Sequence, residues 1–599
     1  MITVEIDMHL CSMRLINVEA FLEREQLFRQ GKQVDRRAKV LEFGDDEVTE
    51  YAILSHRWIE QEVDYKEIVK LAKMDEEERS EIRQRDGYRK ILQSCKQAKK
   101  DGYKWLWVDT CCIDKRSSAE LSEAINSMYR WYENSKICYA YLHDVPGSSF
   151  PTARNNEWYA RKLNGWPEWF SRGWTLQEMI APRDVQFFNK HWHPIGDKRS
   201  LSPILEVITR VPRDILKEGL SSNRPCVAQI MSWAAYRTTT RVEDRAYSLM
   251  GLLDVNMPML YGEGKKAFQR LQLEIIRMSN DQSIFAWGVR RIGSILADDP
   301  SYFRNCEKME LMNQDEFVRS FIPEEELPSL DDRFGTFPIT NRGIRIWLFL
   351  RPLVGSDSVF EALLPCHSHP SGSPVAINLT LWESNYCRYG GSIHHEWGDL
   401  QLCHVYLRYQ DTPHRNVTFE IDDSAITGKG FAYSVAFPEG LITGNTVTLT
   451  TDPLCVKNYI CSQGYDFAVG FGQCFGQNWI HVVGKGPDSP LDSLWSSYDL
   501  ILASAPECAQ SMKKARVGDA GCQVYIMETP LPRSTWILQT SCVMWKSSRM
   551  CGVKLEVFQD SGFSNVSGEW KGFDVDVSGF FFVHAHYYLI QVTIYTGNR

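Results

Sequence analysis

The chain lacks any apolar run long enough to cross a membrane. None of its 599 residues belongs to a stretch of about 20 consecutive apolar residues, the length that a spanning helix requires. The first residues also lack a basic segment followed by an apolar core, so we expect no secretory signal. The sequence thus predicts neither a membrane span nor export.

Paired cysteine motifs and a basic surface are missing too. The 17 cysteines are odd in number and scattered, without the C-x-x-C arms typical of zinc sites. This pattern indicates reduced thiols, so we expect a cytoplasmic location and no metal site. The net charge of −9 argues against nucleic-acid binding, which usually requires a basic face. The sequence contains no phosphate-binding loop of Walker type and no solenoid or propeller repeat.

The most informative segment that is present covers residues 105–142. An apolar run at 105–108 ends on Asp109, and a second apolar run covers 137–142. Between them lies a polar loop and an amphipathic helix whose apolar stripe contains Leu121, Ile125, Met128 and Tyr132. Two short, wholly apolar strands joined by a helix predict a parallel sheet. In such sheets ligands bind outside the carboxyl ends of the strands.

The rest of the first half follows the same alternation of strands and helices. Further strands are expected at 51–55 and 184–188, with helices at 87–100 and 169–179. From about 200 to 285 the pattern becomes helical. The first half is therefore expected to be an α/β domain with a central parallel sheet and a helical extension. Within that extension, adjacent Asp244 and Arg245 are expected to form an ion pair.

The second half has a different pattern. Residues 291–325 are acidic and irregular, with a run of three glutamates at 324–326, so a linker is expected here. From 326 to 599 many short segments rich in β-branched and aromatic residues are separated by Gly, Pro, Asn and Ser. Short strands without intervening helices predict an all-β domain, either a sandwich or a barrel.

Four ordered motifs resemble the fungal heterokaryon-incompatibility (HET) domain. They are YAILSHRW at 51–58, WVDTCCID at 107–114, RGWTLQE at 172–178 and RVEDRAYSLMG at 241–251. The resemblance implies a HET domain over residues 1–290, with a core at 50–190 and a helical extension at 200–290. It also implies a role in fungal non-self recognition, a form of innate immunity, and in programmed cell death. The fold implied is similar to TIR domains, with a flavodoxin-like sheet, and some TIR domains cleave NAD.

The candidate catalytic residues are Glu120 and Glu123. Cleavage of the bond between nicotinamide and ribose passes through an oxocarbenium-like state, which an ionised carboxylate stabilises. The spacing places Glu120 at the edge of the buried stripe, whereas Glu123 points toward solvent. The alternative for Glu120 is structural, because Ser117 and Glu120 have the spacing of a capping box.

The candidate ligand-binding residues lie at strand ends or in the third motif; they are Ser55, His56, Trp58, Asp109, Cys111 and Arg172. Four of them have a structural alternative. Asp109 has the position to cap a loop, Trp58 to fill the core, His56 to be a satisfied structural residue, and Arg172 to form a buried ion pair. Cys111 or Cys112 with His56 also suggests a thiol hydrolase.

Two functional hypotheses remain open at this point. In one, the HET domain is an NAD glycohydrolase that takes NAD as substrate and needs no cofactor. In the other, it is a non-enzymatic module that signals by self-association. Both allow a homo-oligomer, an unidentified protein trigger, and a C-terminal β-domain that restrains the HET domain.

Overall fold

The computed structural model describes most of the chain. The described residues are 13–32, 34, 39–43, 50–153, 165–220, 224–289, 291–321, 337–354, 358–368, 372–390, 398–410, 416–450, 454–461, 466–485, 498, 501, 502, 504–506, 508, 509, 522–530, 536–545, 550–559, 581–583 and 586–591. The three glutamates at 324–326 lie outside them. The chain forms two compact units, the first from Met1–Gly288, Leu296–Ser320 and Pro365–Pro374, the second from Val289–Ile295, Phe321–Leu364 and Val375–Arg599.

A seven-stranded sheet forms the centre of the first unit, in the order β2-β1-β4-β3-β5-β6-β7. The strands are β1 (Arg14–Asn17), β2 (Leu41–Phe43), β3 (Tyr51–His56), β4 (Trp105–Val108), β5 (Ile137–Tyr141), β6 (Val185–Phe188) and β7 (Pro194–Asp197). Strand β3 pairs in parallel with β4 and β5, and β5 pairs in parallel with β6. The predicted parallel core is confirmed, and antiparallel strands extend it on both sides.

The strand order creates a change of direction at the middle of this sheet. After β3 the chain forms β4 on one side and then crosses to form β5 on the other side. In sheets of this kind the helices that follow diverge at the switch, and ligands bind there, outside the carboxyl ends of the strands. The switch point of this sheet lies between β3 and β5.

Helices connect these strands and cover the sheet. Before β4 they are α1 (Val18–Arg29), α2 (Tyr65–Lys70), η1 (Leu71–Lys73), α3 (Glu76–Gln84) and α4 (Asp86–Lys100); after it come α5 (Ser118–Asn134), η3 (Glu168–Ser171) and α6 (Thr175–Ile180). Of the predicted stripe on α5, Ile125, Met128 and Tyr132 are buried, and Leu121 is half-buried. The ring of Tyr132 packs edge-on against Trp107 of β4, at 5.8 Å between centroids. Burial of these apolar side chains stabilises α5 on the sheet.

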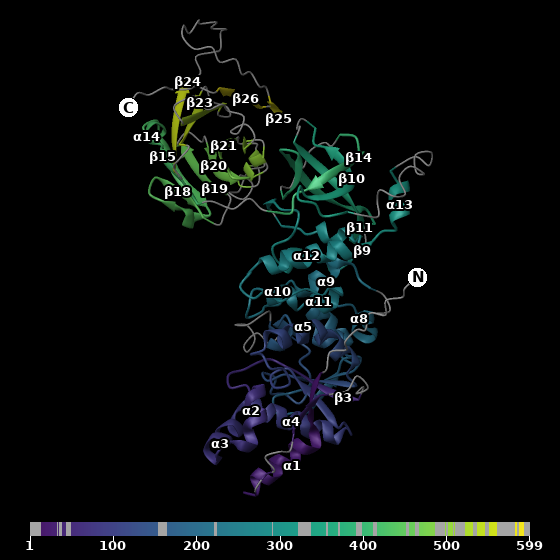
Figure 1. Cartoon of the computed structure of the whole chain (residues 1–599). Helices are drawn as coiled ribbons and strands as arrows, with labels where there is room; N and C mark the ends of the chain where they lie inside the picture. Colours follow the sequence, from purple (N-terminus) through teal and green to yellow (C-terminus); the bar gives the residue numbers. More distant parts are fainter. Residues whose placement is uncertain are drawn as a thin grey trace. The chain divides into compact units, whose positions relative to one another are not determined.

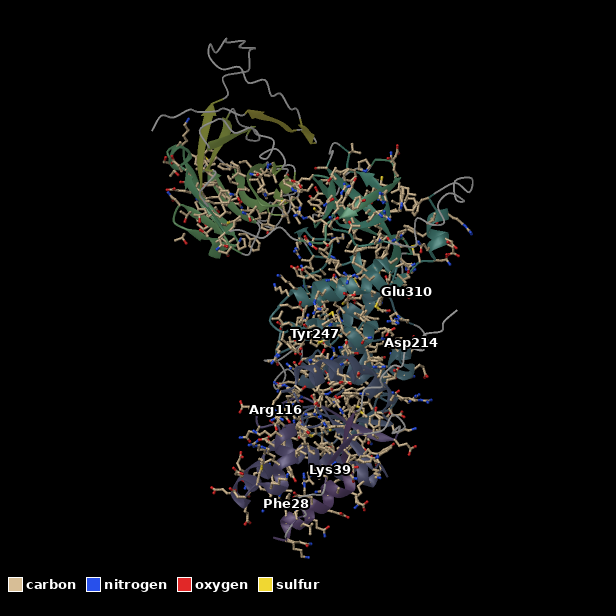
Figure 2. All side chains as sticks on the ribbon, in the orientation of Figure 1. Phe28, Lys39, Arg116, Asp214, Tyr247 and Glu310 are labelled. Atoms are coloured by element: carbon tan, nitrogen blue, oxygen red, sulfur yellow. The ribbon has the colours of Figure 1, made fainter. Side chains whose placement is uncertain are left out.

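The helical extension is present as predicted. It contains α7 (Ser202–Thr209), α8 (Arg213–Glu218), α9 (Val227–Ala234), α10 (Asp244–Tyr247), α11 (Met250–Leu253) and α12 (Lys266–Met278). Helix α11 packs closely on α5, because a Cβ at Gly251 would lie 2.2 Å from the Cβ of Tyr129 (Figure 1). On α10, Tyr247, labelled in Figure 2, extends its side chain from the helical extension. Its hydroxyl donates a hydrogen bond to Glu263 at 2.9 Å.

Two expectations for this region need correction. Arg245 pairs with Asp299, at 2.6 and 2.8 Å, rather than with its neighbour Asp244, since adjacent residues on a helix point in different directions. The segment predicted as a linker is folded in its described part, with β8 (Ile292–Gly293), η5 (Pro300–Phe303), β9 (Met309–Leu311) and α13 (Gln314–Arg319). Its apolar side chains Ile295, Leu296 and Phe303 are fully buried, which outweighs the acidic composition.

The second unit is all-β, with a barrel and a sandwich. The barrel strands are β10 (Ile344–Pro352), β14 (Gln401–Leu407), β13 (Asn385–Tyr389), β12 (Pro374–Trp382) and β11 (Val359–Ser368), and β11 pairs again with β10 to close the barrel. The sandwich consists of an eight-stranded sheet and a four-stranded sheet.

The eight-stranded sheet has the order β17 (Ile442–Thr443), β18 (Thr446–Leu449), β15 (Val417–Asp422), β24 (Met550–Gln559), β23 (Trp536–Trp545), β22 (Cys522–Pro530), β26 (His586–Gln591) and β25 (Phe581–Val583). The four-stranded sheet contains β16 (Phe431–Phe437), β19 (Leu454–Cys461), β20 (Asp466–Cys474) and β21 (Gln477–Lys485). Both sheets contribute to one apolar core, for example Phe419 from the first and Phe471 from the second. The sequence left sandwich and barrel as alternatives, and the structure contains both.

Candidate functional site at the carboxyl edge of the parallel sheet

His56, at the end of β3, lies between two carboxylates. Its Nε2 is 3.6 Å from Oε2 of Glu62, and its Nδ1 is 3.9 Å from Oδ1 of Asp109, which follows β4. The parallel pairing of β3 and β4 brings the two strand ends together, so the structure places His56 beside Asp109. Only 1% of the His56 side chain is exposed, so solvent and ligands do not reach the ring.

Glu62 is held ionised by this cluster. Burial raises the pKa of Glu62, but contacts with His56 and with Lys90 of α4 outweigh it and lower the pKa to about 2. The Lys90 ammonium pairs with Glu62 and also donates to the carbonyl of Arg57 at 3.3 Å. Burial lowers the pKa of Lys90. The cluster therefore fixes α4 to the carboxyl end of β3.

Trp58 is an exposed aromatic surface fixed to this cluster. Half of the residue is exposed, and its Nε1 donates to Oδ2 of Asp109 at 2.7 Å. The Lys115 ammonium lies 3.6 Å from the centre of the indole ring, and burial lowers the pKa of that ammonium. Trp58 is thus not a core residue, and Asp109 fixes its orientation at the sheet edge.

Glu120 lies at the same end of the sheet with a full set of partners. Nη2 of Arg14, on β1, donates to Oε2 of Glu120 at 2.9 Å, and the amide of Asp114 donates to Oε1 at 2.7 Å. Ser117 accepts from the amide of Glu120 at 3.3 Å, as a helix cap does. Half of the predicted capping box is therefore formed, while the carboxylate itself joins the 109–117 loop to β1. Glu123 is exposed, as its spacing indicated.

The thiols beside Asp109 do not have the properties of nucleophiles. Cys111 and Cys112 are both buried. The neighbouring Cys112 thiol and burial raise the pKa of Cys111 well above its ordinary value. A thiol that stays protonated at neutral pH is a poor nucleophile, so the geometry does not support a thiol hydrolase.

Ser55, at the end of β3, belongs to a buried network beneath the edge. The Ser55 hydroxyl donates to Glu178 of α6 and accepts from Nε1 of Trp169 at 2.9 Å. Burial raises the pKa of Glu178 to about 8 and lowers that of nearby Arg237 to about 9. Ser55 therefore bonds protein groups rather than solvent.

Arg172 is half-buried beside this network. Its Nη2 donates to the hydroxyl of Thr240 at 3.0 Å. Burial and the nearby Arg57 both lower its pKa.

Sequence reasoning missed four charged residues at the switch point: Arg57, His143, Asp144 and Glu168. Arg57 pairs with Glu168, and its Nη1 lies 3.4 Å from Nε2 of His143. The amide of Glu168 donates to Oδ2 of Asp144 at 2.8 Å. His143 and Asp144 directly follow the apolar run at 137–142. Asp109 was selected because ligands bind beyond the carboxyl ends of parallel strands, and the same reasoning applied to this run selects His143 and Asp144.

The described residues contain no group of three or more His, Cys, Asp or Glu side chains arranged to hold a metal ion. In the part of the chain that the structure describes, no helix has the length and apolar character needed to span a bilayer.

A family model described as Heterokaryon incompatibility protein (HET) matches residues 51–166, which contain the ends of β3, β4 and β5. The chain is a HET-domain protein. A second model, a domain of unknown function (DUF8212), matches residues 266–293.

The vegetative incompatibility protein HET-E-1 of Podospora anserina is 45% identical over 230 residues, 38% of this chain. This HET-domain chain spans only 16% of the length of that relative. Among solved structures, the Xerocomus chrysenteron lectin XCL aligns with 24% of the chain and 98% of the lectin, at 9% identity and a TM-score of 0.18. A mutated form of the lectin aligns at 8% identity with a TM-score of 0.17. Likenesses at these TM-scores carry no argument about fold or function.

Proposed function

We propose that this HET-domain protein acts in vegetative incompatibility, as an effector of cell death after non-self recognition. Two findings support this role. Residues 51–166 match the HET family model, and the chain is 45% identical in sequence to a vegetative incompatibility protein over 230 residues. We further propose that the carboxyl edge of the parallel sheet hydrolyses NAD or a related nucleotide. A protein partner or ligand then serves as the trigger.

The strand order supports a nucleotide as the ligand. The parallel strands occur in the order β4-β3-β5-β6, so the first strand in the chain lies between the second and the third. Flavodoxin-like sheets share this order and bind a flavin nucleotide at the switch between their first and third strands. A TIR-like relationship is part of this proposal.

The observation that carries the proposal is the exposed indole of Trp58, fixed by Asp109 at this edge. A planar base can stack on such a ring, and stacking of a base on an aromatic side chain contributes about 1–3 kcal/mol. Carboxylates beside the ring suit a reaction in which positive charge develops on a ribose.

Glu120 has a conditional role in this chemistry. It lies in the first turn of α5, where the helix dipole favours an anion. Its carboxylate is bonded to Arg14 and to the Asp114 amide. To stabilise a ribosyl cation, Glu120 has to exchange Arg14 for the substrate.

The test is nicotinamide release from NAD by purified full-length protein, followed by chromatography. We expect the wild type to release nicotinamide and Trp58→Ala to raise KM about 5- to 150-fold, since one stacked ring is lost. Glu120→Gln is expected to abolish release, with Glu123→Gln as the matched control on the same helix. If Glu120→Gln releases nicotinamide at the wild-type rate, Glu120 is not catalytic. NAD hydrolysis by the protein is still supported in that case, because the wild type is active.

The alternative function is a non-enzymatic module that acts by self-association. If the protein releases no nicotinamide from NAD or NADP at any protein concentration, hydrolysis is contradicted and this alternative is favoured. Sedimentation of the same samples then measures assembly directly.

A further inference from the structure

A second cluster of charged side chains flanks the switch point between β3 and β5. Arg57 follows β3, His143 and Asp144 follow β5, and Glu168 begins η3. The exposed fractions of these side chains are 32% for Arg57, 22% for His143, 16% for Asp144 and 11% for Glu168. Arg57, His143 and Asp144 are therefore partly exposed, unlike His56, whereas Glu168 is mostly buried. The cluster occupies the place where parallel sheets bind ligands.

The contacts of His143 place a donor and an acceptor at one ring nitrogen. Its Nε2 lies 3.4 Å from Nη1 of Arg57 and 3.8 Å from Oε2 of Glu168. A guanidinium can only donate, so the nearer contact, with Arg57, favours the tautomer in which Nε2 accepts. The proton is then on Nδ1, which faces Oδ1 of Asp144 at 4.0 Å. A carboxylate on the Nδ1 side of a ring whose Nε2 accepts is the pairing that general-base histidines use, here at a distance beyond a hydrogen bond.

The facing atoms of His143 and Asp144 are poised to bond. Nδ1 of His143 and Oδ1 of Asp144 are both buried, and neither has a hydrogen-bond partner among the described residues. Buried polar atoms without partners are costly. A small approach of the two side chains satisfies both atoms and locks the Nδ1-protonated tautomer.

The charges around the ring favour its neutral form. Burial lowers the pKa of His143, as do Arg57 and Lys90, while Asp144 and Glu168 act in the opposite direction. A histidine whose pKa lies below its ordinary value of about 6.5 is neutral at pH 7 and can accept a proton.

The opposite side of the cluster is rigid. Glu168 is held through its side chain by Arg57 and through its amide by Asp144, at 2.8 Å for the amide. The adjacent Trp169 donates to Ser55 of β3 at 2.9 Å. The backbone of Glu168 is thus fixed on both sides and its carboxylate is oriented by Arg57, which suits electrostatic stabilisation of a developing charge.

We propose that His143 is the general base of the hydrolysis, with Asp144 as its positioning residue and Glu168 as the carboxylate beside the ribose. The assignment rests on the function proposed above. A water oxygen bonds to the anomeric carbon of the ribose as the bond from that carbon to the ring nitrogen of nicotinamide breaks. The electron pair of the broken bond neutralises the positive charge of the leaving nicotinamide. Nε2 of His143 exchanges its contact with Arg57 for the water, and the water proton passes to Nε2 and then to solvent. One NAD and one water thus yield ADP-ribose, nicotinamide and a proton.

His143→Gln tests the assignment in the full chain. We expect kcat for nicotinamide release to fall about 100-fold or more, with KM within about threefold, since a general base contributes about 10²–10⁴. His193→Gln, at an exposed histidine, is the control and keeps the wild-type rate. Imidazole added to His143→Ala is expected to restore part of the activity, which a purely structural role does not predict.

The pH profile provides the second readout. In the wild type, kcat is expected to fall as the pH drops below the lowered pKa of His143. This acid limb is absent in His143→Gln. In Asp144→Asn the limb moves to lower pH, because one anion facing the ring is lost while Arg57, Lys90 and Glu168 remain. If His143→Gln does not fold, this shift decides the question.

The outcomes separate the two proposals. Wild-type rate and an unchanged pH profile in folded His143→Gln overturn the assignment of His143 but leave NAD hydrolysis intact. An unmoved acid limb in Asp144→Asn overturns the positioning role of Asp144. No nicotinamide release by the wild type overturns hydrolysis and, with it, this inference.

Discussion

The two units use buried charge in different ways. In the first unit, buried charged residues such as Lys90, Glu168 and Glu178 gather near the carboxyl ends of the parallel strands. In the second unit, Lys457 on β19 is buried with Asp423, at 3.0 Å, and Asp423 also accepts from Tyr459 at 2.9 Å. That group closes on itself within the sandwich.

The difference follows from strand direction. Parallel strands direct all their carboxyl ends to one edge, so polar residues that follow several strands meet there. Antiparallel strands alternate, so no edge collects residues from successive strand ends. The comparison teaches that chemistry is to be sought in the first unit, while ion pairs of the second unit act in stability.

The largest expected effect concerns the ion pair between Lys90 and Glu62. Lys90→Met leaves the carboxylate of Glu62 without its buried cation, and we expect a loss of about 3–5 kcal/mol in the free energy of unfolding. Urea unfolding measures it, with Lys96→Met, exposed on the same helix, as control. Equal stability of the two variants contradicts the importance of this pair.

The same pair predicts acid sensitivity. The pKa of Glu62 is lowered to about 2 in the folded chain, so its stabilising contribution is complete above about pH 4.5. The contribution is lost as the pH falls from there toward 2. The stability difference between wild type and Glu62→Gln is therefore expected to shrink over this range.

In the second unit, Asp423→Asn is expected to cost about 2 kcal/mol, because Lys457 loses its counter-ion. Asp423 is 19% exposed, which reduces the penalty. Nicotinamide release is expected to stay at the wild-type rate, and Glu420→Gln, at an exposed position of β15, is the stability control. A change in turnover without unfolding contradicts the division of roles between the units.

Glu178 is expected to make stability fall with rising pH. Its pKa is raised to about 8 by burial, so between about pH 4.5 and 8 the folded chain binds a proton that the unfolded chain does not. Each pH unit in this window costs up to about 1.4 kcal/mol. Melting temperatures of wild type and Glu178→Gln between pH 5 and 8 measure the slope, and parallel curves contradict a protonated Glu178.

The smallest expected effect separates capping from catalysis at α5. Ser117→Ala removes the acceptor of the Glu120 amide and is expected to cost about 1 kcal/mol. Turnover per folded molecule is expected to stay unchanged, because Arg14 and the Asp114 amide still hold the Glu120 carboxylate. A loss of turnover equal to that of Glu120→Gln shows that the cap itself positions the carboxylate.

The sequence by itself determined the local elements of the first unit. The apolar run at 105–108 became β4 with the same bounds, and the helix predicted at 87–100 became Asp86–Lys100. The spacing of apolar residues along the chain predicts both the type of element and its buried face, because side chains repeat about every 3.6 residues on a helix and every 2 on a strand. The exposed position of Glu123 followed from the same spacing.

Only the tertiary structure decided the partners of the charged residues. Arg14 binds Glu120 across 106 positions, and Ser55 binds Glu178 across 123. Such contacts depend on strand order and on the antiparallel pairing of β1 with β4. The spacing of apolar residues in the sequence predicts neither of these. For the same reason the sequence placed Asp109 at a strand end but did not show that it holds Trp58, nor that His143 faces Arg57 at the switch point.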